Sequence, residues 1–189
     1  AFVFRRTGQN WAQEDVLLPS SPDGMFGESV AVSGDTIVVG DQDGGRAYVF
    51  DWNGSDWEEK LSLSALGCDS VGIDADTAFI GKGSSVIVLV RSAGLWTTLG
   101  TLLPSAGNFS SFGEHLSVSG NTAVVSAWDH AASDGVAFVF VRDGSTWTIQ
   151  TVLRSPTDNG DFAEAVAVSD SDDVAIVTAR NGEVAGQGS

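Results

Sequence analysis

A segment of about fifteen residues recurs along this chain and constrains its fold more than any other feature. "FGESVAVSGDTIVVG" at 26–40 returns as "FGEHLSVSGNTAVVS" at 112–126, and more loosely as "GCDSVGIDADTAFIG" at 67–81 and "FAEAVAVSDSDDVAIVT" at 162–178. A second segment that ends in Trp follows the first three copies: "RAYVFDWNGSDW" at 46–57, "VIVLVRSAGLW" at 86–96 and "VAFVFVRDGSTW" at 136–147. Self-similarity at a period of this length is typical of stacked copies of one supersecondary unit.

The fourth copy of the second segment is the N-terminus itself, "AFVFRRTGQNW" at 1–11. The repeat tryptophans Trp11, Trp57, Trp96 and Trp147 are 46, 39 and 51 residues apart, and the spacing from Trp147 through the C-terminus to Trp11 is 53. We therefore expect four repeats in the 189 residues, one of them split between the two ends. The expected divisions are 1–20 (second half of the split repeat), 21–65, 66–105, 106–156 and 157–189 (first half of the split repeat).

Each repeat is predicted to be a four-stranded antiparallel unit. In the repeat at 21–65 the strands are expected at about 29–32, 36–40, 47–51 and 58–63, with Gly, Asn and Asp in the tight turns between them. One sheet of this size cannot bury both of its faces, so the units must stack on one another. The sequence thus predicts an all-β fold of β-propeller blades, with the repeat tryptophans packed between adjacent blades.

These residues resemble the FG-GAP repeat family, the blades of integrin-α-like propellers. The resemblance is carried by Phe26-Gly27 and Phe112-Gly113, the "SVAVSGDT" run, "VVG" at 38–40 and "AYVF" with its downstream Trp. It covers essentially the whole chain and is weakest in the second repeat, where Gly67-Cys68 replaces Phe-Gly. The resemblance implies a non-enzymatic β-propeller at the cell surface or outside the cell, used in adhesion or scaffolding.

Blades of this family often carry a calcium loop of the form D-x-D-x-D-G-x-x-D, in which alternating carboxylates supply oxygen ligands. The nearest match here is Asp41-Gln42-Asp43-Gly44, and the other three repeats depart further from the pattern. We expect no cofactor or at most one Ca²⁺, held by Asp41 and Asp43. The alternative is that both are solvated turn carboxylates.

An acidic residue occupies the same position at the start of every repeat. In a closed propeller the first strands line the axis, so these residues could form an acidic ring that binds a cation or a polar ligand at one mouth. The alternative is a set of solvated strand starts that keep like charges apart. The four residues are Glu28, Asp69, Glu114 and Glu164.

The composition excludes several classes of function. A net charge of −16 argues against nucleic acid and anionic membranes as partners, and no apolar run is long enough to span a membrane. The two His residues form no nucleophile system or metal-ligand spacing, so no enzymatic activity is expected.

The single cysteine, Cys68, is expected to be a buried thiol. Asn53 and Asn108 begin N-glycosylation sequons in predicted loops and are glycosylation candidates.

Two functions remain open at this stage. In the first, the chain is an extracellular structural protein that joins other copies of itself, head to tail or in tandem, into a fibre or scaffold. In the second, it is a ligand-binding or cell-adhesion propeller for an extracellular protein or glycan, closed within one chain or part of a longer array. In either case we expect the split repeat to be completed at a junction where 1–4 pairs as a third strand beside 175–178, within one chain as a compact monomer or between chains as an open polymer. The junction residues are Ala1, Phe2, Val3, Phe4, Gln187, Gly188 and Ser189.

Overall fold

The computed structural model describes residues 1–21, 24–64, 67–105, 109, 111–127, 135–155, 162–169, 171 and 173–179. Every regular element in these ranges is a β-strand, as the repeat pattern predicts. The same ranges contain no helix long and apolar enough to cross a membrane. The strands are β1 (Phe2–Thr7), β2 (Asn10–Val16), β3 (Phe26–Ser33), β4 (Thr36–Asp41), β5 (Arg46–Trp52), β6 (Trp57–Ser64), β7 (Ser70–Asp74), β8 (Thr77–Gly81), β9 (Val86–Ser92), β10 (Leu95–Leu102), β11 (Leu116–Ser119), β12 (Thr122–Ala127), β13 (Val136–Asp143), β14 (Thr146–Arg154), β15 (Phe162–Ser169) and β16 (Val174–Ala179).

The strands form three four-stranded antiparallel sheets, β3–β6, β7–β10 and β11–β14, and two two-stranded sheets, β1–β2 and β15–β16. In each sheet the spatial order follows the chain, as in a meander of hairpins. The strands expected in the repeat at 21–65 coincide with β3–β6, and differ from them only at the ends.

Each two-stranded sheet has a register shift like that of one hairpin in a complete four-stranded sheet. The hairpin of third and fourth strands has a register shift after Val49 in β5 and after Val139 in β13, and β1 has the same shift after Val3. The hairpin of first and second strands has a shift after Phe26 in β3, and β15 has one after Phe162. β1–β2 thus shares its register shift with the hairpins of third and fourth strands, and β15–β16 shares its shift with the hairpin of first and second strands.

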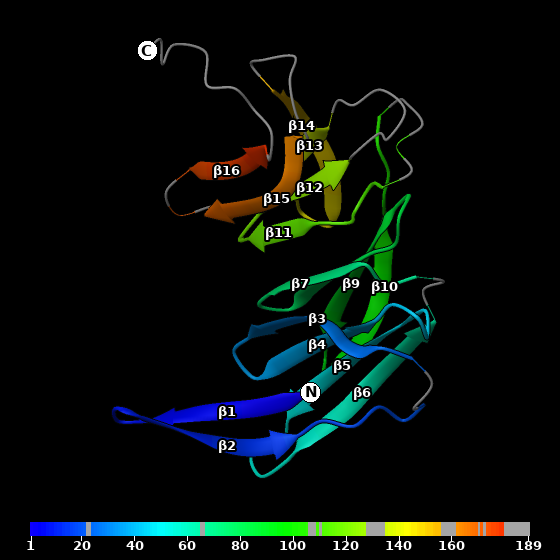
Figure 1. Cartoon of the computed structure of the whole chain (residues 1–189). Helices are drawn as coiled ribbons and strands as arrows, with labels where there is room; N and C mark the ends of the chain where they lie inside the picture. The colour runs from blue at the N-terminus through cyan, green and yellow to red at the C-terminus, as the bar shows by residue number, and fades with distance from the viewer. Residues whose placement is uncertain are drawn as a thin grey trace.

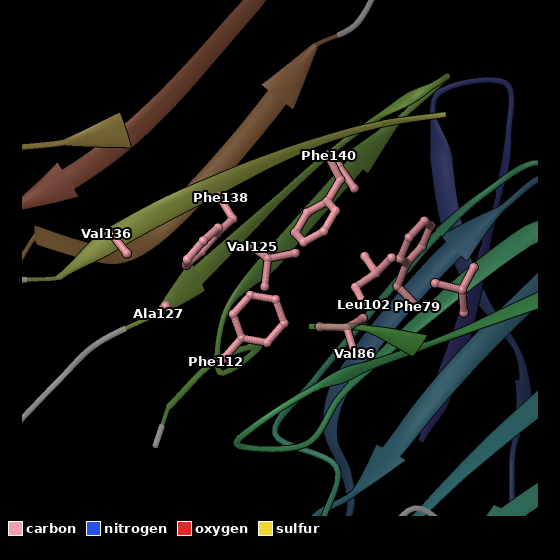
Figure 2. Close-up of a cluster of buried hydrophobic side chains, with 11 residues drawn as sticks. Phe79, Val86, Leu102, Phe112, Val125, Ala127, Val136, Phe138 and Phe140 are labelled. Atoms are coloured by element: carbon pink, nitrogen blue, oxygen red, sulfur yellow. The ribbon is translucent and has the colours of Figure 1, made fainter. Parts of the chain in front are cut away.

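The sheets stack face to face in chain order, from β1–β2 at one end to β15–β16 at the other (Figure 1). The first strands of successive sheets are in contact, β3 with β7, β7 with β11 and β11 with β15. The apolar core lies between the sheets, because alternate side chains of each strand point to opposite faces. Figure 2 shows the cluster between β7–β10 and β11–β14, in which Phe79 and Val86 of one sheet face Phe138 and Phe140 of the next.

The expected pairing of 1–4 with 175–178 does not occur within this chain. β1 pairs with β2 and β16 pairs with β15, and the two half-sheets lie at opposite ends of the stack (Figure 1). Pairing of these strands between copies therefore stays a prediction.

Candidate functional site: joints between repeats and two open faces

A network of polar side chains joins the first two complete sheets. The guanidinium of Arg91 in β9 donates through Nη1 to Thr36 Oγ1 (3.0 Å) and to Asp51 Oδ1 (3.1 Å) of the preceding sheet. Thr36 also donates to Asp51 (2.7 Å), and the indole Nε1 of Trp96 donates to the other carboxylate oxygen of Asp51 (3.1 Å). Arg91 Nε donates to Asp76 (2.7 Å), so the guanidinium is held from two sides. Asp51 is buried, and these charged hydrogen bonds compensate for its burial.

The next joint repeats one contact of this network and lacks another. Arg142 of β13 donates through Nη1 to Thr77 Oγ1 of the preceding sheet, again at 3.0 Å. Trp147 packs edge-on against Phe79 at 5.1 Å between ring centroids, but its buried Nε1 has no hydrogen-bond partner in the described structure. The acceptor is missing because Val90 of β7–β10 occupies the position that Asp51 has in β3–β6. Val90 pairs with Thr77 in the same way as Asp51 pairs with Thr36.

The same Arg and Trp positions recur in the half-sheet β1–β2. Arg91 is paired with Trp96 and Arg142 with Trp147 across their hairpins, and Arg6 is paired with Trp11 in the same way. The first complete sheet, β3–β6, has Trp52 opposite Trp57 at these positions.

The second and third complete sheets also approach each other closely at Gly81. Ser70 of β7 donates its hydroxyl to the carbonyl oxygen of Gly113 in the next repeat (2.7 Å). A Cβ atom placed on Gly81 would lie only 1.9 Å from that oxygen, so the absence of a side chain at Gly81 permits this approach.

One end of the stack presents an open apolar surface, here called the head face. It comprises Phe2, Phe4 and Trp11 of β1–β2 with Val30 and Val32 of β3, which are 55–67% exposed. These side chains line a groove of about 600 Å³ between β1 and β3. The expectation that the repeat tryptophans are packed between units holds for Trp96, which is 7% exposed, but not for Trp11, because none of the described sheets covers the head face.

The opposite end presents a second apolar surface, the tail face, on β15–β16. Val174 and Ile176 are 56% and 62% exposed, and Ala165 and Ala167 beside them are also exposed. A hollow of about 270 Å³ adjoins this face and is lined by residues that include Thr122, Val139 and Val174. Among the junction residues, Gln187, Gly188 and Ser189 lie outside the described residues.

The four aligned acidic residues are placed unevenly. Glu28 and Glu114 are exposed, Glu164 is partly buried, and Asp69 accepts a hydrogen bond from Gln42 Nε2 (2.8 Å). In the described part of the chain no three His, Cys, Asp or Glu side chains gather as metal ligands. The acidic ring thus stays a prediction that requires a closed arrangement of the blades.

Asp41 and Asp43 differ in their surroundings. Asp41 is fully buried; its Oδ1 accepts from Gly44 N (2.9 Å), while its buried Oδ2 has no hydrogen-bond partner in the described structure. Asp43 is exposed in the turn that follows. A buried carboxylate oxygen without a donor suits a cation, but Ca²⁺ needs six to eight oxygens, and among the described residues no group of three His, Cys, Asp or Glu side chains is placed to supply them.

Two further predicted sites are placed as follows. Cys68 is buried as expected, and this burial raises the pKa of its thiol to about 11, so the thiolate nucleophile is scarce at neutral pH. Asn53 lies in the exposed β5–β6 turn, where its Nδ2 donates to Glu58 Oε1 (2.6 Å) and its Oδ1 accepts from the backbone of Ser55 and Asp56. Asn108 lies outside the described residues.

Sequence reasoning missed the arginines that bridge the sheets. The signal was present, because Arg6, Arg91 and Arg142 each precede a repeat Trp by five residues. Since the next strand folds back antiparallel, this spacing places the Arg and the Trp opposite each other, at the same edge of the sheet.

A comparison with protein families bears on these residues. The model of the FG-GAP repeat matches residues 11–50, which run from the Trp of one hairpin to the third strand of the following sheet. Residues 11–50 are thus similar to an FG-GAP repeat. The resemblance drawn from Phe26-Gly27 and the "SVAVSGDT" run is thereby confirmed. No curated protein matches the sequence.

Solved structures support the fold alone. The chain is similar to Saccharomyces cerevisiae Sqt1 (TM-score 0.51, 10% identity, 69% of this chain and 36% of that chain). It is also similar to the computationally designed protein Ika4, with a TM-score of 0.52 and 19% identity over 85% of this chain and 94% of that chain. A third similar structure is YCF48 bound to D1 peptide, with a TM-score of 0.51 and 14% identity over 90% of this chain and 52% of that chain. The chain spans about a third of Sqt1 and half of YCF48. Together with the FG-GAP repeat, the propeller-like neighbours support a β-propeller module.

Proposed function

We propose that this chain is a non-enzymatic, extracellular structural protein whose FG-GAP repeats join head to tail with other copies into a fibre or scaffold. The observation that carries this proposal is the complementarity of the two ends. In this proposal the sheet β15–β16 supplies strands one and two of a repeat, and the sheet β1–β2 supplies strands three and four. The two sheets lie at opposite ends of the stack (Figure 1).

Completion of a sheet between copies has a clear physical advantage. β1 and β16 are edge strands, and each presents unpaired N–H and C=O groups beside exposed apolar side chains. Pairing the two edges by β-augmentation would satisfy both rows and cover both faces. The contact joins two different surfaces, so it is heterologous and generates an open polymer unless its rotation closes a ring. Tandem repetition in one longer chain would give the same contact.

The extracellular location is proposed because FG-GAP repeats are typical of extracellular or surface proteins. The exposed sequon at Asn53 is compatible with it. We include at most one Ca²⁺ in the proposal, with Asp41 as its first ligand on account of the unpartnered buried Oδ2.

Deletion of 1–6 tests the proposal. In sedimentation velocity, the parent chain should show sedimentation coefficients that rise with concentration, and the deletion variant should remain monomeric while its far-ultraviolet circular dichroism still reports β-sheet. Leu95→Ser is a matched control, since Leu95 is exposed far from either face and should assemble like the parent. A deletion variant that assembles as the parent does, or a parent that is monomeric throughout, would contradict the proposal.

The groove of the head face favours one alternative, a ligand-binding or cell-adhesion module. Exposed aromatic rings beside Arg5 and Arg6 offer both stacking and charge to an extracellular protein or glycan. Under this alternative, the parent would stay monomeric, and a glycan or peptide array would identify ligands whose binding Trp11→Ala abolishes.

A further inference from the structure

We propose that a second copy of this chain docks on the tail face in one fixed register, with its Arg6 donating to Thr122. In this register its β1 pairs with β16 so that Phe4 lies opposite Ala175 and Ala1 opposite Thr178. The inference rests on the proposed self-assembly and adds which residues select the partner and the alignment.

The first argument is an arginine–threonine contact that recurs at the joints inside the chain. Arg91 donates to Thr36, and Arg142 donates to Thr77, both through Nη1 at 3.0 Å. Each Thr begins the second strand of the sheet that precedes the Arg. The remaining residues that begin second strands are Thr122 in β12 and Val174 in β16.

Each side chain at the Arg position finds a matching residue at the start of a second strand only if the head of one copy meets the tail of another. Arg6 would meet Thr122 of the preceding copy, and Trp52, which replaces Arg in the first complete sheet, would meet Val174, which replaces Thr. Every Arg then faces a Thr, and the one apolar side chain at this position faces the one Val. Such matched replacement is the expected signature of specific recognition.

Arg6 is already held in the geometry that this contact requires. Its Nε donates to the Gly8 carbonyl oxygen (2.9 Å), as Arg142 Nε donates to the carbonyl oxygen of Gly144 (2.8 Å). Arg142 makes its contact with Thr77 from this same position. The Arg6 side chain therefore needs little reordering on docking, which lowers the entropic cost of association.

The apolar faces follow the same correspondence. Phe2 and Phe4 occupy the positions of Phe138 and Phe140, which are buried against the preceding sheet. In a docked copy they would lie against the sheet that contains Val139, beside the hollow of the tail face.

The exposed side chains of β16 and β3 also have counterparts at a joint inside the chain. Ile176 pairs with Ala167 as Phe79 pairs with Gly72, and a Cβ on Gly72 would lie 2.5 Å from Leu116 of the following first strand. By this correspondence the tail face would pack against Val30 and Val32 of the incoming copy, which are exposed.

Charge also favours this contact over others. Each chain carries a net charge of −16, so two copies repel one another unless cations lie at the junction. Arg5 and Arg6 lie on the hairpin β1–β2, where Arg5 also forms an ion pair with Glu14. In the proposed register Arg5 lies opposite Val174, next to Asp173 of the tail hollow. A reversed or shifted pairing would lose this complementarity.

Crosslinking of two single-cysteine variants tests the register. Phe4→Cys in one preparation and Ala175→Cys in another should form a disulfide-linked dimer on mild oxidation, because opposite positions in a β-ladder lie within disulfide reach. Phe2→Cys with Ala175→Cys is the matched control, displaced by two residues, and should crosslink at least tenfold more slowly. Cys68 is buried and common to all variants.

Association measured by sedimentation tests the recognition. Arg6→Ala should weaken association about tenfold, the effect of losing one charged hydrogen bond, and Thr122→Val should add nothing in that background. Arg154→Ala removes the same charge from an exposed site away from the proposed junction and should have little effect. If the parent assembles but the matched and displaced cysteine pairs react equally, this register is wrong while self-assembly stands. If the parent does not assemble at all, the proposed function fails as well.

Discussion

Among the glycines that the structure describes, Gly81 is the one where an added Cβ would meet its nearest neighbour most closely. It lies in β8, and its Cβ would meet the carbonyl oxygen of Gly113 at 1.9 Å and the hydroxyl of Ser70 at 2.6 Å. In Gly81→Ala the contact with the Gly113 oxygen must open by about 1.1 Å to reach the 3.0 Å below which real Cβ contacts essentially never occur. Because that atom belongs to the backbone of the next repeat, the strain falls on the joint between two sheets.

The magnitude follows from two losses. Overpacking a close contact costs about 1–3 kcal/mol, and breaking the Ser70–Gly113 hydrogen bond costs about 1 kcal/mol more. We therefore expect Gly81→Ala to lower the free energy of unfolding by about 2–4 kcal/mol. Gly100→Ala in β10 is the matched control: its Cβ meets nothing within 4 Å, and the smaller entropy of the unfolded chain should stabilise it by about 0.4–1 kcal/mol.

Urea unfolding followed by circular dichroism measures both variants. The midpoint of Gly81→Ala should fall clearly below that of the parent, and the midpoint of Gly100→Ala should equal or exceed it. A Gly81→Ala midpoint at or above that of Gly100→Ala would refute the close approach of these repeats.

Three further outcomes are expected. Cys68 should react with a thiol reagent at pH 8 only after unfolding. Burial raises the pKa of its thiol to about 11, so the stability that the protonated thiol contributes is complete below the unfolded thiol pKa, about 8.5, and is lost as the pH rises through 11. Cys68→Ala should remove this pH-dependent loss of stability. Calorimetric titration should find at most one Ca²⁺ per chain, and Asp41→Asn should abolish that binding while Asp56→Asn does not. The hydrogen bond from Arg5 lowers the pKa of the Glu14 carboxyl, so Arg5→Ala should raise that pKa in a carbon-13 NMR titration, whereas Arg154→Ala should leave it unchanged.

The fold was predictable because local and global signals agree. Gly34 and Gly54 mark the tight turns with positive φ, and the short apolar runs at 37–39 and 47–50 between them mark buried strands. The second repeat shows where local spacing shifts: Gly67 takes the positive φ that Gly27 and Gly113 have one position later in the motif, which is why Phe-Gly is replaced by Gly-Cys.

The contacts between sheets were harder to predict, because they depend on how neighbouring repeats are rotated and not on the repeat itself. Asp51 looks like an ordinary strand residue in the sequence, and only the stacked sheets show that it accepts from Arg91 and Trp96. The clustering of the acidic strand starts likewise depends on closure of the blades, which periodicity does not determine.

Trp96 and Trp147 occupy the same position in successive repeats, yet we expect opposite responses to Trp→Phe. The Trp96 indole donates to the buried carboxylate of Asp51, and a hydrogen bond to a charged group contributes about 1.5–3 kcal/mol. The Trp147 indole N–H is buried without a partner among the described residues, so its removal relieves a desolvation cost of about 1–3 kcal/mol that offsets the smaller apolar area of Phe.

Trp96→Phe should therefore lower the urea midpoint markedly, and Trp147→Phe should leave it nearly unchanged. Because both variants make the same covalent change, the difference between them isolates the hydrogen bond across the joint. Adding Asp51→Ala should then reduce the difference, since without the carboxylate neither indole has a charged acceptor in the preceding sheet. Equal losses in the two single variants would mean that the tryptophans stabilise the joints through packing alone, and that the polar network between the sheets contributes no net stability.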